Sequence, residues 1–300
     1  EGERQGGDAA AGPSGPVLPE GAEGVLPSQL LERAVAAGWV GATYEKIPTD
    51  AIQPASLDLR LGERAYRVRA SFLPDDETVE AKLSDLVVDE LDLRDEGAVL
   101  ETNRPYLIPL IEELALPDGV RARTNPKSST GRLDVFTRVI TDHSYRFDEI
   151  DAGYQGRLWL EVVPLSFTVR VRHRLALNQL RLVAGRAELT DADLHERHAR
   201  EPFLFRGDEP VSDAELATAD GLFLSLDLEG DAAGRVGHRA KGNAPLLDMG
   251  KVGAHDPADY WEPVLREGGD RIILDPERFY LLLSDESVRV PPDLAAEMTA

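Results

Sequence analysis

The stretch of the sequence that is richest in reactive side chains runs from residue 125 to residue 133, with the sequence NPKSSTGRL. It holds Lys127, then three consecutive residues with hydroxyl groups (Ser128, Ser129 and Thr130), and then Arg132. Hydroxyls and backbone N–H groups beside cationic side chains are what the oxygens of a polyphosphate require. The run is not a Walker A loop, because that loop places a glycine directly before its lysine. We therefore expect either a phosphate-binding turn or a polar turn that only joins two strands.

A second stretch, residues 150–156, places Gly153 and Gly156 on either side of Tyr154, and Asp151 precedes them. Glycines on both sides of an aromatic residue are typical of a β-hairpin whose backbone bends closely around a planar ligand. The sequence IDAGYQG therefore predicts such a hairpin.

Glu161 follows Asp151 by ten residues and lies in the apolar run 158–163. A carboxylate among apolar residues is costly to bury unless it is paired or used in chemistry. The alternative is a glutamate on the solvent-facing side of a strand. Periodicity favours that alternative, because Glu161 and Trp159 would share one face. The residues alone leave both interpretations open.

Short apolar runs supply the elements that must position these residues. Strand-like runs occupy residues 56–61, 66–70, 106–110 and 158–163, and glycine and proline separate them. Residues 27–38 predict an N-capped amphipathic helix, and the charged stretch 188–201 predicts a solvated helix that joins two units. The segments between strands are mostly too short for crossover helices. We therefore expect a mainly β chain with a distorted jelly-roll or β-barrel domain and few helices.

The composition indicates a folded protein of two domains. A chain of 300 residues with 42% hydrophobic residues can bury a sizeable core. No stretch reaches the roughly 18 apolar residues of a spanning helix, and no signal pattern is present, so we expect a cytoplasmic protein without membrane partners. A formal charge of −22 repels nucleic-acid polymers, although a local cluster of cations can still bind a compact triphosphate.

Several short segments recur in the same order in the second half of the chain. The segment SLDL at 56–59 returns at 225–228, RPYL at 104–107 returns as RFYL at 278–281, and PD at 117–118 returns at 292–293. Their order and near-constant spacing favour a duplicated domain. The second copy would stop before a counterpart of residues 125–133. We therefore expect either a truncated sequence or a shortened, purely structural half-domain.

Four ordered motifs resemble the dCTP deaminase family, which belongs to the trimeric dUTPase-like superfamily. They are IQPASLDLRLG at 52–62, KSSxxR at 127–132, IDxGYQG at 150–156 with Glu161 after it, and LNQL at 177–180. With the composition, the resemblance divides the chain into four parts. These are a disordered tail (1–23), a deaminase-like domain (24–187), a linker helix region (188–219) and an incomplete second dUTPase-like domain (220–300).

The resemblance implies a catalytic set in which Glu161 is the general base and acid, Ser128 places the attacking water, and Arg132 orients the water and the carboxylate. It also implies the nucleotide-binding positions Lys127, Ser129, Asp151, Gly153, Tyr154 and Gln179. The substrate would be dCTP and the products dUTP and ammonia. Within the superfamily, the resemblance implies that dUTP diphosphatases also have the aspartate at the position of Asp151. The glutamate ten residues later, Glu161, is therefore what marks a deaminase.

The composition restricts how such an enzyme could activate water. The chain has no cysteine, and zinc nucleobase deaminases need His with two Cys, or three Cys, around the metal. We therefore expect no zinc, and a mechanism in which one desolvated carboxylate moves the protons of a positioned water. Mg²⁺ would enter with the substrate, held by triphosphate oxygens and water.

Two other functions and the state of assembly remain open. In a dUTP diphosphatase, or a bifunctional enzyme, Asp151 would activate water at phosphorus. A nucleotide-binding regulator would bind without turnover. Sites of the superfamily lie between subunits, so we expect a homo-oligomer, either a trimer or a pseudo-symmetric assembly of tandem domains.

The sequence also departs from the family pattern. Ala152 stands where many deaminases have proline, and Glu149 stands where a basic residue near the phosphates is expected. The segment 134–150 is longer than in short members of the family. The HERH segment at 195–198 is one residue short of the HExxH metal motif, so we do not expect a metal there.

Overall fold

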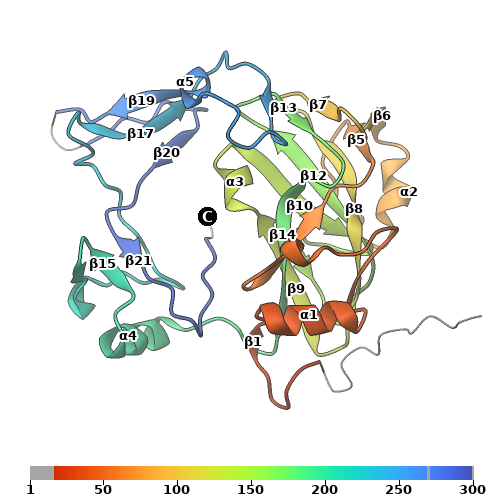
Figure 1. Cartoon of the computed structure of the whole chain (residues 1–300), viewed down its shortest axis with the longest axis horizontal. Coiled ribbons are helices and arrows are strands. Elements are labelled where there is room, and N and C mark those ends of the chain that lie inside the picture. The colour runs from red at the N-terminus through yellow and green to blue at the C-terminus, as the bar shows by residue number, and fades with distance from the viewer. Residues whose placement is uncertain (1–16, 269–270, 299–300) are drawn as a thin grey trace, which may run out of the picture.

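The computed structural model describes residues 17–268 and 271–298, and strands form most of its regular structure (Figure 1). Two large antiparallel sheets face each other in the first half of the chain, and smaller sheets complete the described structure. The prediction of a mainly β chain with few helices is confirmed.

The first large sheet holds six strands. They are β1 (Gly24–Val25), β3 (Ile52–Gln53), β4 (Ser56–Arg60), β9 (Val120–Pro126), β11 (Glu149–Ile150) and β14 (Ala176–Ala184). Their order is β11-β9-β14-β4-β3, and β1 pairs with β14. This sheet therefore carries both the end of the strand before Lys127 and the strand that contains Gln179.

The second large sheet also holds six strands. They are β2 (Val40–Ala42), β5 (Arg64–Val68), β6 (Val87–Asp92), β8 (Tyr106–Ala115), β10 (Val135–Thr141) and β12 (Gln155–Pro164). Their order is β10-β12-β8-β5-β6, and β2 pairs with β8. The strands predicted over 56–61, 66–70, 106–110 and 158–163 are confirmed as β4, β5, β8 and β12.

Apolar side chains from the facing sides of the two sheets fill the space between them. Leu57 and Leu59 on β4 are fully buried on either side of the half-buried Asp58, and Leu160 on β12 belongs to the same core. Because strand side chains alternate, the other face of β12 points away from this core. Trp159 lies on that outer face, in a smaller apolar cluster covered by α2 (Val79–Leu83).

The helices of the described residues are short. They are α1 (Ser28–Ala36), α2, α3 (Ser128–Gly131), α4 (Asp191–Arg200) and α5 (Pro257–Tyr260), with 3₁₀ turns η1 (Thr49–Ala51) and η2 (Asp213–Glu215). The helix predicted over 27–38 is confirmed as α1. Its expected N-cap is wrong, because Pro27 occupies that position and makes no side-chain cap.

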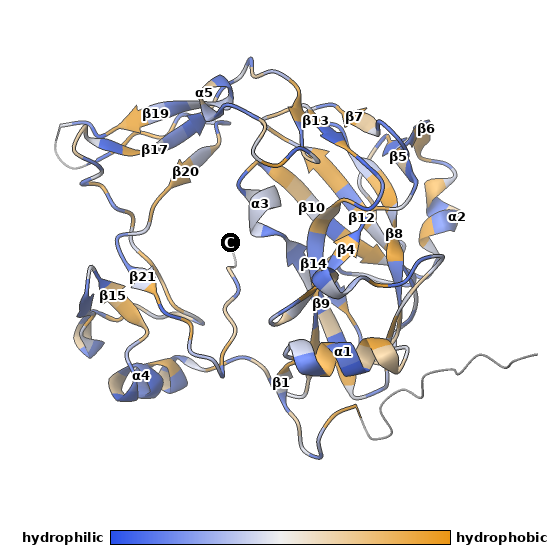
Figure 2. Cartoon of the chain, viewed as in Figure 1, coloured by the Kyte–Doolittle hydropathy of each residue, from blue (hydrophilic) through white to orange (hydrophobic). Residues whose placement is uncertain are grey.

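The helix predicted over 188–201 is confirmed as α4, and Thr190 and Asp193 form a capping box at its start. Figure 2 shows that this helix is hydrophilic over most of its length. It is not solvated on all sides, because His198 is buried and stacks edge-on against Phe203. One face of α4 thus packs on a small apolar cluster of the second half.

The hairpin predicted at residues 150–156 is wrong. β11 pairs with β9 in the first sheet, whereas β12 pairs with β10 and β8 in the second. The chain therefore crosses from one sheet to the other at these residues. The sequence could not reveal this crossing, because the pairing partners of the two strands lie far away along the chain.

Smaller sheets include one shared between the two halves and two in the second half. One contains β7 (Ala98–Leu100), β13 (Val169–Val171) and β18 (Leu247–Asp248), another β15 (Leu204–Arg206), β16 (Glu209–Pro210) and β21 (Ser287–Val288), and a third β17 (Arg235–Ala240), β19 (Trp261–Leu265) and β20 (Tyr280–Leu282). The parallel pairing of β18 with β13 joins the halves. Tyr260 and Trp261 also pack edge-on against Phe167, so these aromatics of the second half pack with the main core of the first.

The predicted repeat and tail are seen only in part. Residues 56–59 lie in β4, whereas 225–228 form no named strand, and Leu226 makes a single bridge to Ser284. The duplicated domain therefore stays a prediction. Of the tail predicted over 1–23, residues 1–16 lie outside the described part, and Val17 and Leu18 pack against the main core. In the described ranges, no helix is long and apolar enough to cross a membrane.

An ion pair buried between strands of the two large sheets offers a test of the fold. Arg60 on β4 donates to Glu112 on β8 from Nε over 2.6 Å and from its backbone N–H over 2.7 Å. Both residues are buried, and burial raises the pKa of Glu112 although the Arg60 hydrogen bonds oppose this. A carboxyl whose pKa is raised on folding stabilises the fold at low pH and loses that contribution as the pH rises.

We predict that Arg60→Met lowers the free energy of unfolding by about 3–5 kcal/mol at neutral pH, because a buried carboxylate loses its partner. The deficit should shrink as the pH falls, since protonation removes the unpaired charge. Urea unfolding at several pH values measures this. The double variant Arg60→Met/Glu112→Leu is the control and should recover most of the stability. A pH-independent deficit that the double variant does not relieve would contradict the account.

Candidate functional site

The turn at residues 125–133 follows β9 and contains α3. The Lys127 carbonyl accepts the N–H groups of Thr130 and Gly131, over 2.8 and 3.0 Å, which closes the turn. Thr130 is buried beneath the turn, whereas Ser128 and Ser129 are exposed. Arg132 follows the helix and is exposed as well. The turn thus presents two hydroxyls and a guanidinium to solvent.

Lys127 and Gln179 lie close together in the first sheet. Lys127 Nζ pairs with Asp58 on β4, and Gln179 on β14 stands opposite Asp58 in the strand register. Gln179 Oε1 also accepts a 3.0 Å hydrogen bond from Ser56. The two predicted nucleotide-binding residues therefore share one polar patch, in which a carboxylate compensates the charge of the lysine.

The crossing at residues 151–156 carries three further predicted positions. Gly153 has φ of +78°, and a Cβ there would lie 2.9 Å from Oδ1 of Asp118. The Tyr154 hydroxyl donates to the Arg157 carbonyl over 2.7 Å, and burial raises the pKa of this phenol. Asp151 is exposed, so its carboxylate is open to solvent.

Glu161 lies at the middle of β12 and is only 2% exposed. It shares the outer face of the sheet with Trp159, as periodicity predicts, but it is covered rather than solvated. Arg138 stands directly opposite on β10 and donates to Glu161 Oε1 from Nε over 3.1 Å and from Nη2 over 2.6 Å. This cation offsets the cost of burying the carboxylate.

The predicted site residues fall into separate groups within one chain. Lys127 and Gln179 share the polar patch of the first sheet, while Glu161 lies on the outer face of the second. In the described part of the chain, neither Ser128 nor Arg132 hydrogen-bonds to Glu161. Their predicted roles around one water stay predictions.

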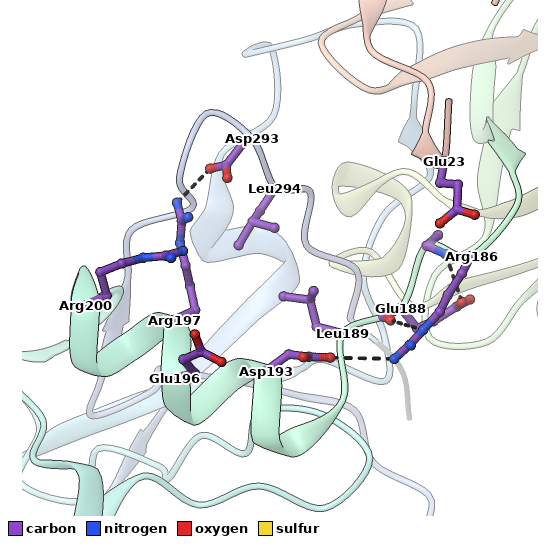
Figure 3. A pocket seen from close by; sticks show the side chains of 11 residues that line it. Glu23, Arg186, Glu188, Leu189, Asp193, Glu196, Arg197, Arg200, Asp293 and Leu294 are labelled. Carbon is purple, nitrogen blue, oxygen red and sulfur yellow. Dashed lines mark hydrogen bonds and ion pairs between the residues drawn. The ribbon is translucent and has the colours of Figure 1, made fainter. Parts of the chain in front are cut away.

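A pocket of about 430 Å³ lies elsewhere, between α4 and the segment after β21 (Figure 3). Arg197 and Arg186 line it, and they pair with Asp293 and Asp193 respectively. None of the predicted site residues lines this pocket. Its wall carries more carboxylates than guanidinium groups, so it does not suit a triphosphate.

The two histidines of the HERH segment have different partners. His195 Nδ1 lies 2.6 Å from Asp213, whereas His198 Nε2 lies 2.7 Å from the carbonyl of Val211. Each imidazole is thus held in a separate environment on α4.

Comparison with known proteins connects this geometry to a family. Residues 22–186 match the 2'-deoxycytidine 5'-triphosphate deaminase N-terminal domain, and residues 190–300 match the C-terminal domain of the same family. This chain belongs to the dCTP deaminase family. The resemblance drawn from the four motifs is thereby confirmed.

Individual dCTP deaminases match parts of the chain. A crystal structure of the dCTP deaminase from Agrobacterium tumefaciens is 43% identical with a TM-score of 0.82, covering 90% of this chain and 79% of that one. The dUMP-forming dCTP deaminase of Methanosphaera stadtmanae is 30% identical over 37% of this chain and 54% of its own. The dCTP deaminase of Acidianus ambivalens is 27% identical over 49% and 77%. The chain thus spans about half the length of the Methanosphaera relative.

Sequence reasoning missed the partners of two site residues. Asp58 lies inside a motif that resembles the family, yet nothing in the motif indicates that it pairs with Lys127. Arg138 lies in the run between Arg132 and Asp151 and is the cation opposite Glu161. An arginine within a neighbouring apolar strand could have indicated a partner for the buried carboxylate. The sequence does not give the register that places Arg138 opposite Glu161.

Gly153→Ala should lower the free energy of unfolding by about 1–2 kcal/mol, because an L-residue is strained at positive φ. The new methyl group would also crowd Asp118. Gly119→Ala is a matched control, since a Cβ there meets nothing within 4 Å and Gly119 is not at positive φ. Urea midpoints measure both. Equal stability of the two variants would contradict the role of Gly153 in the crossing.

Proposed function

We propose that this protein catalyses the hydrolytic deamination of dCTP to dUTP and ammonia. The observation that supports this best is Glu161, a carboxylate ten residues after Asp151 that is buried on β12 and paired with Arg138. Membership of the dCTP deaminase family supports dCTP as the substrate. Burial of the carboxylate suits a base, because a desolvated site strengthens its interaction with a positioned water.

In the proposed reaction, Glu161 accepts a proton from water as the water oxygen bonds to the ring carbon that bears the amino group. The carboxyl then returns the proton to that amino nitrogen, the C–N bond breaks, and ammonia leaves. The added hydroxyl loses its proton and the adjacent ring nitrogen gains one, which gives the carbonyl of uracil. A single carboxyl thus serves as base and then acid. Ser128 would accept a hydrogen bond from the water or donate one to it, and Arg132 would orient the water. No zinc is required for these steps.

The phosphate end of the substrate would be held at the turn 125–133 and the patch beside it. Lys127 would exchange its contact with Asp58 for phosphate oxygens, and Ser129 would donate its exposed hydroxyl. Mg²⁺ would arrive as part of the substrate, on the triphosphate. Gln179, Asp151, Gly153 and Tyr154 would contact the nucleoside.

We further propose that the complete site forms between copies of the chain. Ser128 and Arg132 are exposed and make no hydrogen bond to Glu161 within the described part of one chain. The second half also exposes large apolar side chains, among them Val252, Leu265, Ile273 and Leu283. Such groups favour burial against another chain. A homotrimer or a pseudo-symmetric assembly of the tandem domains fits both observations.

A second candidate is a bifunctional enzyme that continues to dUMP. The relatives from Methanosphaera stadtmanae and Parafrankia are named dUMP-forming dCTP deaminases. The exposed carboxylate of Asp151 would then activate water at phosphorus. Chromatography of the nucleotide product distinguishes the two enzymes, because the first forms dUTP and the bifunctional enzyme forms dUMP. Formation of dUMP also releases pyrophosphate. A regulator without catalysis would bind dCTP and release neither product.

Glu161→Gln should lower ammonia release from dCTP and magnesium by about 10²–10⁴-fold, because the amide cannot accept the proton of water. Binding of dCTP should persist, since the phosphate contacts are unchanged. Continuous ammonia assay and equilibrium dialysis measure the two quantities. A chelator selective for zinc should leave wild-type turnover unchanged. Undiminished ammonia release from the variant would remove Glu161 from the mechanism.

Mixing two inactive variants tests whether the site lies between copies. Ser128→Ala and Glu161→Gln proteins should each be inactive, and co-refolding equal amounts should restore roughly a quarter of the sites if one chain supplies Ser128 and its neighbour Glu161. Activity of the mixed preparation measures this. The double variant Ser128→Ala/Glu161→Gln, refolded with wild type, serves as the control for subunit exchange. A mixture no more active than its components would place the whole site in one chain.

A further inference from the structure

We infer that Arg138 is a positioning residue that fixes which oxygen of Glu161 faces the reacting water. The inference rests on the proposed function, in which Glu161 moves the protons. It concerns a residue that the motifs do not include and that acts through the carboxylate rather than on the substrate.

The geometry of the pair is one-sided. An arginine that faces a carboxylate often binds both oxygens with two parallel hydrogen bonds. Here Nε and Nη2 of Arg138 both donate to Oε1 of Glu161, over 3.1 and 2.6 Å. Among the described residues, no hydrogen bond reaches Oε2. The pairing therefore holds the carboxylate in one orientation and leaves the lone pairs of Oε2 available for a proton.

Three side chains hold the guanidinium in place. Ser71 accepts a 2.8 Å hydrogen bond from Nη2. The Phe147 ring lies on one side of the guanidinium, with its centroid 3.7 Å from Cζ, and the Phe136 centroid is 4.9 Å away. Stacking on aromatic rings and a fixed fork of donors suit arginine and not lysine. Arg138 therefore has little freedom to turn away from Glu161.

Phe147 belongs to a loop, residues 142–148, that is anchored at both ends. Asp148 Oδ1 accepts the N–H of Val139 and the hydroxyl of Thr124, over 2.8 and 2.7 Å. At the other end, Asp142 Oδ1 accepts the N–H of Val79 at the start of α2 over 2.8 Å. The two anchors therefore hold the Phe147 ring against the guanidinium of Arg138.

The catalytic consequence follows from geometry. A base that is displaced by about 1 Å can lose on the order of 10²-fold in rate, because proton transfer needs a short, aligned contact. Without Arg138, the carboxylate could rotate and Oε2 would no longer be held toward the water. The residue should therefore affect kcat more than the binding of dCTP.

Arg138→Met should lower kcat by about 10²-fold while KM for dCTP stays close to the wild-type value. Arg138→Lys should recover part of the loss, because it restores one donor without the fork. Introduced into the Glu161→Gln protein, Arg138→Met should lower the residual rate no further, since its effect passes through Glu161. Steady-state ammonia release measures these rates, with long incubations for the slow variants.

Arg157→Met is the matched control, because it removes a β12 arginine that pairs with Glu80 on the exposed surface, and kcat should not change. Phe147→Leu keeps the ion pair but removes the ring. It should lower kcat by about tenfold even if Arg138→Met does not fold. Folded Arg138→Met with wild-type kcat, or an equal fall in the Glu161→Gln background, would overturn the inference. Failure of the proposed function is distinct, because then wild type releases no ammonia or Glu161→Gln releases it at the wild-type rate.

Discussion

The antiparallel register of β10 and β12 is the constraint on which the site depends, because it places Arg138 directly opposite Glu161. A lone carboxylate on this covered face would carry a large desolvation cost, and the facing guanidinium offsets it. A slip of one residue would turn every side chain of β12 to the opposite face. Leu158 and Leu160 would then leave the core and Glu161 would enter it. Packing between the two sheets therefore fixes the position of the carboxylate.

The same two-sheet arrangement places the charged and amide groups of the candidate site on one sheet and its buried carboxylate on the other. The first sheet carries Lys127 and Gln179 beside Asp58, a patch that we propose exchanges its internal ion pair for phosphate contacts. The second sheet carries the buried carboxylate. The crossing at 151–156 passes from one to the other, and its left-handed glycine permits that turn. Assembly with another copy is the step that would bring the exposed Ser128 to a carboxylate.

Periodicity and motifs predicted the parts of the structure that local sequence determines. Residues 27–38 formed a helix and 158–163 a strand, because their apolar spacing matches one face of each element. The family followed from four ordered motifs. The face of Glu161 was predicted correctly from its spacing to Trp159, but its burial was not, because α2, from a distant part of the chain, and the loop 142–148 cover that face.

Long-range pairing accounts for what the sequence did not reveal. The hairpin at 150–156 was wrong because β11 and β12 find partners in different sheets. Arg138 was missed because the length of the segment between β10 and β12 does not determine which residues of the two strands lie opposite each other.

A crystal structure of the Glu161→Gln protein with dCTP and magnesium tests the central claim most directly. The account predicts that the cytosine ring carbon bearing the amino group lies beside the side chain at position 161, with Arg138 on the far side of that side chain. It also predicts the triphosphate at the turn 125–133. A nucleotide bound elsewhere, or Arg138 turned onto the phosphates, would contradict it.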